Sequence, residues 1–189
     1  RQKDYQSILK AGKWKQAVQA YLASITYADA QLGRILDELD NAPFGKKTIV
    51  TLWSDHGWHL GEKGHWHKTT LWEEATRVPF IISAPGYTPG KCSQPVNLID
   101  LYPTLNELCH LSPPPEHDGI SLRPLLQKPD TRWNRPSIIE FKPGNVAVRS
   151  ERYRYIQYSD GGQEFYDLTT DPYEWTNLAG APEFADQIA

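Results

Sequence analysis

The sequence predicts an α/β fold with a mostly parallel sheet, joined to a small C-terminal subdomain with an antiparallel sheet. Helix-like and strand-like segments alternate through residues 1–136, which is the order of βα units. From residue 137 the segments are short and alternate apolar with polar residues, and Asp160-Gly161-Gly162 has the composition of a hairpin turn. We therefore expect an α/β part over residues 1–136 and an antiparallel part over residues 137–189.

The first predicted element is a helix over residues 16–40. Its apolar residues recur at spacings of four and three, which places them on one face of the helix. These residues are Tyr21, Ile25, Ala28, Leu32, Ile35 and Leu39. The helix is expected to cover an apolar surface with this face and to end at Asn41-Ala42-Pro43.

Two strands are predicted next. Thr48–Trp53 is an uninterrupted run of apolar and β-branched residues, which is typical of a strand buried on both faces of a parallel sheet. After a glycine-rich loop and a short helical stretch over residues 70–75, Val78–Ser83 has the same character. The alternation of helix and strand favours parallel pairing.

A second long helix is predicted from Asp100, as the N-cap, to about His110, with three leucines on its apolar face: Leu101, Leu105 and Leu108. Ser112–Pro115 reads as a stiff connector. The antiparallel strands are expected at Ser137–Phe141, Val146–Arg149, Tyr153–Tyr158 and Glu164–Leu168. We expect Tyr153, Tyr155 and Tyr158 to form the strand face that packs on the α/β part.

Composition excludes several classes of protein. The 189 residues carry 20 Lys and Arg against 23 Asp and Glu without blocks of one sign, so no general affinity for nucleic acid or anionic membrane is indicated. The longest apolar stretches are far shorter than the roughly 18 residues of a membrane span.

Two residue types are informative by their number. Cys92 and Cys109 lack the spacing of a zinc knuckle, and a disulfide between them stays open. The absence of any Met indicates a piece of a longer protein.

Most of the candidate catalytic and metal-binding residues lie in the loop Ser54–Lys68, which follows the first predicted strand. Ligand sites in α/β sheets lie at the carboxyl ends of strands, which is where Asp55 and His56 are expected. A carboxylate and an imidazole both bind metals, and Gly57 permits the tight turn that lets them converge. The alternative is structural, with Asp55 capping the turn and His56 hydrogen-bonded within the loop.

A wider set of motifs resembles the sulfatase family of the alkaline-phosphatase superfamily, in particular its iduronate-2-sulfatase-like and choline-sulfatase-like branches. The motifs are Asp55-His56-Gly57, Leu60-Gly61-Glu62, Trp66, Lys68, Arg77-Val78-Pro79, Asn97–Leu105, Asp118–Leu125 and Glu164–Leu168. The resemblance covers nearly the whole chain. It implies the C-terminal portion of an alkaline-phosphatase-like sandwich and a lysosomal, periplasmic or secreted enzyme.

The resemblance also implies a chemistry. Asp55 and His56 would be two ligands of a catalytic divalent metal ion, usually calcium. Lys68 would be the catalytic residue whose ammonium group contacts the sulfate oxygens. A metal and an ammonium group suit the charge that develops on those oxygens during hydrolysis of a sulfate monoester. Because His56 offers nitrogen, Mg²⁺ and Zn²⁺ stay open beside Ca²⁺. His67, next to Lys68, is a second candidate for contact with the substrate, a sulfated small molecule or glycan.

The nucleophile of the resemblance is missing. Sulfatases use a formylglycine made from a Cys/Ser-x-Pro-x-Arg motif, and neither Cys92 nor Cys109 begins one. We expect the formylglycine and further metal ligands in an N-terminal part of the same enzyme. Two alternatives stay open: a phosphodiesterase or phosphonate monoester hydrolase of the same superfamily, and a non-catalytic fragment.

Other side chains of this region receive weaker assignments. Trp58 and Trp66 are candidates for stacking on a sugar ring, although tryptophan is as typical of a core. Glu62, Glu73 and Glu74 have no spacing that indicates the paired carboxylates of glycoside hydrolysis, and such acids are expected on solvated helix faces.

Overall fold

The computed structural model describes residues 2–112 and 116–188, so most of the expected connector Ser112–Pro115 lies outside the described residues. The helices are α1 (Gln2–Lys10), α2 (Trp14–Asn41), α3 (Glu73–Thr76), α4 (Leu101–Leu108), α5 (Arg123–Gln127) and α6 (Ala185–Ile188). The strands are β1 (Val50–Trp53), β2 (His59–Leu60), β3 (Trp66–His67), β4 (Phe80–Ser83), β5 (Ser137–Glu140), β6 (Val146–Arg149), β7 (Tyr153–Gln157) and β8 (Gln163–Asp167).

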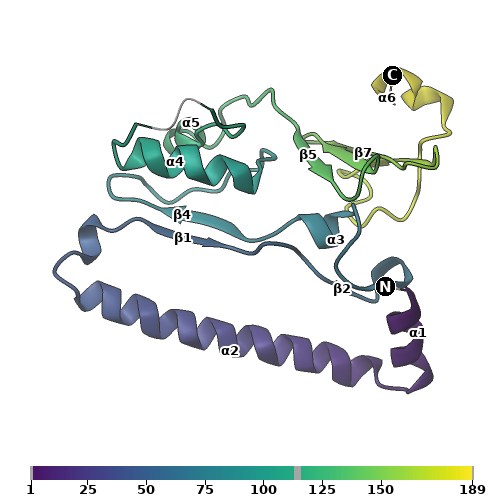
Figure 1. The fold of residues 1–189 in the computed structure, drawn as a ribbon, viewed down its shortest axis with the longest axis horizontal. Coiled ribbons are helices and arrows are strands. Elements are labelled where there is room, and N and C mark those ends of the chain that lie inside the picture. The colour runs from purple at the N-terminus through teal and green to yellow at the C-terminus, as the bar shows by residue number, and fades with distance from the viewer. Residues whose placement is uncertain (1, 113–115, 189) are drawn as a thin grey trace.

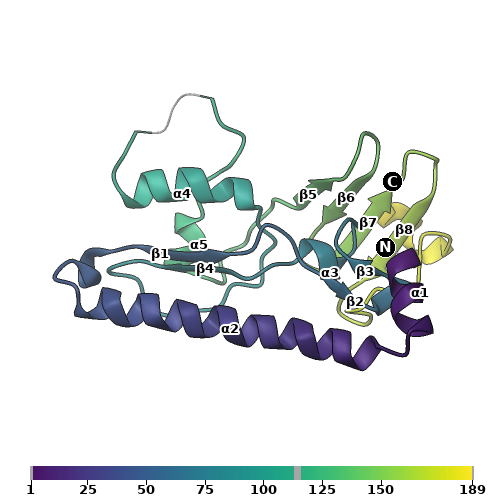
Figure 2. The same ribbon diagram turned by 60° about the horizontal axis from the view of Figure 1, so that its bottom comes forward.

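The predicted first helix is confirmed as α2, which begins and ends within two residues of the expected bounds. It runs alongside β1 and β4 in both views of the ribbon (Figure 1 and Figure 2). No residue of α2 is buried, and Ile35 on its apolar face is 65% exposed. The helix was expected to bury this face against an apolar surface, and the described residues do not provide that burial.

The first two predicted strands are confirmed as β1 and β4, but their pairing differs from the prediction. They run antiparallel, with Val50 opposite Ser83 and Trp53 opposite Phe80. The chain returns to the sheet through the β2–β3 hairpin and the single turn of α3 rather than through a crossover helix, which parallel neighbours require. Trp53 is 47% exposed, so burial on both faces is also not achieved among the described residues.

The C-terminal sheet has the order β5-β6-β7-β8, with every neighbouring pair antiparallel. Its four strands match the predicted ones closely. Ala147, Ile156 and Tyr166 form a buried cluster with Leu71, which comes from the segment just before α3. The main core of the described chain therefore lies where this sheet meets that segment.

The predicted tyrosine face of β7 is wrong, because side chains of a strand alternate between its two sides. Arg154 and Ile156 are the buried residues of β7. Tyr158 packs against the buried cluster, whereas Tyr153 stacks on Phe165 at 5.1 Å between ring centroids. The three tyrosines are thus divided between the two sides.

Asp100 is the N-cap residue of α4, as predicted, but its side chain forms no capping hydrogen bond within that helix. It instead forms a reciprocal capping box with Asn97, the N-cap of the 3₁₀ turn Leu98–Asp100 that precedes α4. Asp100 is fully buried and its Oδ1 accepts hydrogen bonds from Ile120 N at 3.0 Å and Arg135 Nη1 at 2.6 Å. Asp100 therefore joins three segments. The residues of α4 that are buried are Pro103, Thr104 and Asn106, whereas its leucines are half-buried.

Two further findings concern membrane-spanning helices and the cysteines. Across the described ranges, the structure has no helix that is long and apolar enough to cross a membrane. Cys92 and Cys109 are both free and exposed, so the disulfide that the sequence left open is not formed.

Candidate functional site

The loop that leaves β1 is held against α3. Ser54 Oγ donates to the His56 carbonyl at 2.8 Å, and Gly57 N donates to the Ala75 carbonyl at 2.8 Å. A Cβ atom at Gly57 would lie 2.1 Å from the Glu74 carbonyl oxygen, so only glycine fits there. The backbone around His56 is consequently fixed by its contact with α3.

Asp55 and His56 point toward one another at the carboxyl end of β1. Asp55 Oδ2 lies 3.6 Å from His56 Nε2. Two ligands about 2.4 Å from one cation and at right angles around it would be about 3.4 Å apart, so this separation fits a shared divalent cation. His56 Nδ1–H donates to the Gly57 carbonyl at 2.8 Å, which leaves the lone pair of Nε2 free to bind a metal or accept a proton donor.

The donor set is nevertheless incomplete. In residues 2–112 and 116–188, no group of three or more His, Cys, Asp or Glu side chains is arranged to hold a metal ion. Asp55 and His56 supply one oxygen and one nitrogen, whereas Ca²⁺ takes six to eight oxygen ligands. The pair fits part of a metal site.

Lys68 lies beside the same pair. Its Nζ donates to His56 Nε2 at 2.7 Å. Asp55, His56 and Lys68 line one cleft of about 1310 Å³, bounded also by β4 and by residues of the C-terminal sheet. The structure thus brings together the three residues on which the predicted chemistry depends.

The backbone around Lys68 adopts a rare conformation. His67 and Thr69, its two chain neighbours, have φ angles of 76° and 77°. Left-handed backbone costs an ordinary residue about 1–2 kcal/mol, and it is particularly unfavourable for a β-branched residue such as Thr69. Strained backbone of this kind clusters at functional sites, where it sets the direction of a side chain. No sequence pattern indicated this feature.

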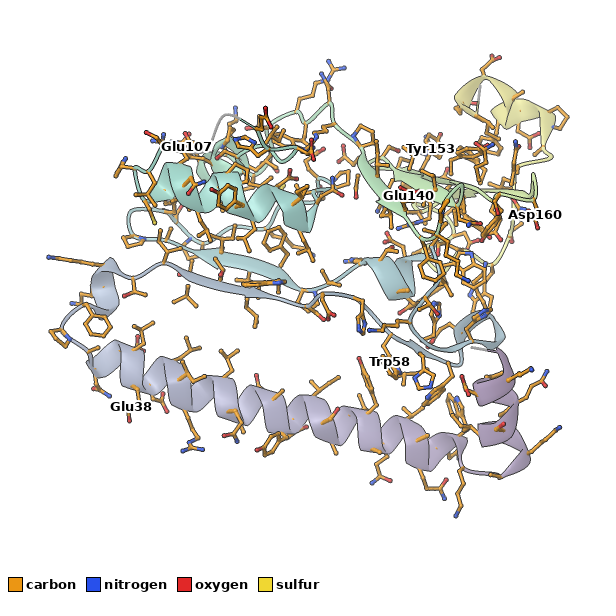
Figure 3. The ribbon with its side chains drawn as sticks, viewed as in Figure 1. Glu38, Trp58, Glu107, Glu140, Tyr153 and Asp160 are labelled. Carbon is orange, nitrogen blue, oxygen red and sulfur yellow. The ribbon has the colours of Figure 1, made fainter. Side chains whose placement is uncertain are left out.

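His67 is placed beside the cleft rather than among its lining residues. Its ring meets Trp58 edge-on at 4.7 Å, and its Nε2 lies 3.9 Å from Asp4 Oδ2 of α1. Trp58 stacks on Tyr21 of α2 at 5.9 Å and on the His56 ring at 6.1 Å. Figure 3 shows Trp58 between this loop and the beginning of α2. Trp58 therefore packs the loop on the N-terminal helices.

Two other side chains of the loop, Trp66 and His59, have structural roles. Trp66 is buried in the core, which is the alternative that the sequence left open beside a sugar contact. His59 is fully buried and its Nε2 shares a hydrogen bond of 2.7 Å with Thr70 Oγ1. Burial lowers the pKa of His59 to about 4, so its imidazole is neutral at physiological pH.

Glu73 contradicts the expectation of a solvated helix face. Its side chain is only 12% exposed and forms ion pairs with Arg149 at 2.9 Å and Arg154 at 2.8 Å. Although burial acts against the charged form, the two guanidinium groups hold the pKa of Glu73 below its ordinary value. These partners lie 76 and 81 residues away along the chain, beyond the reach of any local pattern.

Comparison with known proteins identifies the family of the chain. The family "Sulfatase" matches residues 1–111, and "N-sulphoglucosamine sulphohydrolase, C-terminal" matches residues 61–189. A sulfatase of Formosa agariphila is 43% identical over 181 residues, which cover 95% of this chain and 36% of that protein. The chain therefore spans little more than a third of this curated relative.

Solved structures give the same result. The structure of a protein in complex with its substrate D-glucosamine-2-N,6-O-disulfate superposes with a TM-score of 0.80 at 27% identity, covering 95% of this chain and 39% of that one. A phosphonate monoester hydrolase of Agrobacterium radiobacter superposes with a TM-score of 0.72 at 25% identity, covering 86% of this chain and 37% of that one. Sequence and fold lead to one conclusion: the chain belongs to the sulfatase family.

Proposed function

We propose that the chain is the C-terminal part of a sulfatase that hydrolyses sulfate monoesters on a carbohydrate. The observation that carries the proposal is the convergence of Asp55, His56 and Lys68 in one cleft at the carboxyl end of β1. The structural similarity to a protein solved with a sulfated glucosamine supports a sugar substrate.

Lys68 is the residue proposed to act on the sulfate group. Hydrolysis of a sulfate ester develops negative charge on the sulfur-bound oxygens, and a preorganised ammonium group stabilises that charge in a water-poor cleft. Lysine suits this role because its charge is compact and its stem is flexible. His67 is proposed as a neighbouring substrate contact, since its side chain is partly exposed next to Lys68.

Asp55 Oδ2 and His56 Nε2 are proposed to hold a divalent cation, which would supply Lewis-acid polarisation of the sulfate ester. Calcium is the first choice, and magnesium and zinc are the alternatives because His56 contributes nitrogen. His56 Nε2 has a single lone pair, which now accepts from Lys68. Lys68 would therefore turn from His56 toward the cleft when that lone pair is used by a metal.

The nucleophile is proposed to lie outside these residues. Cys92 and Cys109 are exposed and neither begins a Cys-x-Pro-x-Arg motif. A formylglycine in an N-terminal part of the same enzyme would complete the site, together with further oxygen ligands for the metal.

The second candidate is a phosphonate monoester hydrolase, which the superposition on such an enzyme supports at a lower TM-score. The test is to assay the complete enzyme that contains this chain on an aryl sulfate and on an aryl phosphonate monoester, with calcium and with zinc. A sulfatase should turn over the aryl sulfate in preference. Preference for the phosphonate would replace the first candidate by the second, and turnover of neither substrate would support a non-catalytic fragment.

A further inference from the structure

A buried ionic network joins the C-terminal sheet to the segment behind the cleft. Arg154 of β7 and Glu174 of the segment that follows β8 are each 1% exposed. Burial of a charge is costly unless it is paired, so two charged side chains this buried need oppositely charged partners close by.

The contacts of the network converge on α3. Arg154 Nη1 donates to the Leu71 carbonyl at 2.7 Å, and Nη2 donates to Glu73 Oε2 at 2.8 Å. Arg154 Nε lies 2.7 Å from Glu174 Oε1, and Glu174 Oε2 accepts from the backbone N of Glu73 at 2.8 Å. Arg149 Nε donates to Glu73 Oε1 at 2.9 Å. The first residue of α3 is thus held at its backbone and at both carboxylate oxygens.

These contacts reach both segments of the candidate site. Leu71, whose carbonyl the guanidinium binds, follows Lys68 by three residues. α3 in turn accepts a hydrogen bond at the Ala75 carbonyl from Gly57 N, the residue next to His56. Figure 1 shows α3 between the β1–β2 segment and the C-terminal sheet. The network therefore provides a continuous route of hydrogen bonds from the sheet toward His56 and Lys68.

The strained backbone beside Lys68 makes this support necessary. Left-handed residues such as His67 and Thr69 persist only where the surroundings fix them. A planar guanidinium holds two acceptors in a set geometry, whereas an ammonium group does not.

Lys63 adds a second connection between the loop before Lys68 and the C-terminal sheet, because its Nζ donates to Tyr166 Oη at 3.0 Å and to the Glu174 carbonyl.

We propose that Arg154, fixed by Glu174, is a positioning residue of the sulfatase site, which sets through Leu71 and α3 the placement of Lys68 relative to His56. The proposal rests on the proposed function. In this role the C-terminal sheet would contribute to catalysis through Arg154, although it does not contact the substrate.

The test is a double-mutant cycle in the complete enzyme, with Arg154→Lys and Lys68→Ala. If Arg154 acts by placing Lys68, Arg154→Lys should lower kcat on an aryl sulfate by about tenfold or more with KM little changed, and it should cost nothing further once Lys68 is removed. If the variant only lowers the folded fraction, the same fold-loss would appear in both backgrounds. That second result would overturn the proposal.

A matched control is Arg152→Lys, because Arg152 lies two residues away, is about half exposed and pairs with Asp167 instead. It should leave kcat unchanged. Should Arg154→Lys fail to fold, Glu174→Gln replaces it in the cycle with the same two outcomes, because it weakens the contact that fixes the guanidinium.

Amide hydrogen exchange separates this proposal from the proposed function, because it needs no turnover. Exchange at Gly57 and at residues 67–70 should become faster in Arg154→Lys and not in Arg152→Lys. Faster exchange in an enzyme that turns over no sulfate ester would support the network while refuting the sulfatase activity. Unchanged exchange at these amides would overturn the positioning role.

Discussion

The two regions of the molecule differ in how much of their apolar surface the chain itself covers. In the C-terminal sheet, Ala147 and Ile156 are fully buried and Phe165 nearly so. On α2 no residue is buried, and β1 and β4 also leave large apolar side chains exposed. Because burial of apolar surface is the main favourable contribution to folding, the sheet has a core of its own, whereas the helix and strands present a face that needs a further covering.

The candidate site lies between these regions. One of them supports its backbone, and the other borders its open cleft. The backbone that carries His56 and Lys68 is tied to α3 and the C-terminal sheet, which has a buried core. The cleft itself opens along β4, where packing is not complete. This chain therefore contributes a support and a set of charged groups, and another part of the protein is expected to close the site.

The largest expected effect follows from the open region. The isolated 189-residue chain should have no sulfatase activity, because the nucleophile and further metal ligands are expected elsewhere. The measurement is turnover of an aryl sulfate by the purified chain with calcium present. Clear turnover that Asp55→Ala abolishes would contradict the prediction and would place the nucleophile within these residues.

The next effect concerns Lys68 in the complete enzyme. Lys68→Ala removes a charged contact to the reacting group and should lower kcat by about 10²–10³-fold, as the loss of an oxyanion donor does. Steady-state kinetics on an aryl sulfate measure the loss. Lys46→Ala, at an exposed lysine of the Gly45–Lys47 turn, is the control and should leave kcat unchanged. Full activity of Lys68→Ala would refute the assignment.

Packing in the two regions can be compared directly by truncating one isoleucine in each. Ile156→Ala should destabilise the chain by about 2–5 kcal/mol, because it leaves a cavity in the C-terminal core. Ile35→Ala, at a residue 65% exposed, should cost the isolated chain about 0.5 kcal/mol or less. Urea unfolding of each variant gives both values.

The same two variants test in the complete enzyme whether α2 is covered there. If an N-terminal part covers α2, the cost of Ile35→Ala should rise there to the range of a buried isoleucine, while the cost of Ile156→Ala stays as it was. An equally small cost of Ile35→Ala in both proteins would show that this face of α2 stays open to solvent.

Local patterns predicted the elements of this fold well. The spacing of Tyr21, Ile25 and Leu32 predicted α2, because the periodicity of a helix depends on residues that are close in sequence. For the same reason, the alternation after residue 137 predicted the strands of the C-terminal sheet. The position of Asp55 and His56 followed from the strand before them. Lys68 was found through the resemblance to a family rather than through its spacing.

Contacts between distant segments could not be predicted in this way. Arg154 stands between two tyrosines and reads as the exposed residue of an alternating strand, yet it is buried because Glu73, 81 residues earlier, supplies its counter-charge. The direction of β4 relative to β1 depends on the path of the chain between them, and the left-handed backbone at His67 and Thr69 depends on the surrounding packing. These features belong to tertiary structure.

The last expected effect is the pH dependence of stability at the junction of the two regions, where His59 is buried. Its pKa is about 4 in the folded chain against an ordinary value of 6.5, with burial as the main cause. The folded state therefore binds fewer protons than the unfolded state between these values. The stability that His59 contributes is present above pH 6.5 and is lost as the pH falls toward 4, by at most about 3 kcal/mol.

Urea unfolding of the chain between pH 4 and 7 measures this loss, and His59→Gln tests its origin. Glutamine keeps a hydrogen-bonding group near Thr70 but does not titrate, so the free energy of unfolding of this variant should fall less on acidification than that of the unaltered chain. His110→Gln is the matched control, because His110 is exposed just beyond α4, and it should leave the slope unchanged. An identical acid slope in His59→Gln and the unaltered chain would mean that His59 can be protonated without unfolding, and the loss of stability would then belong to other groups.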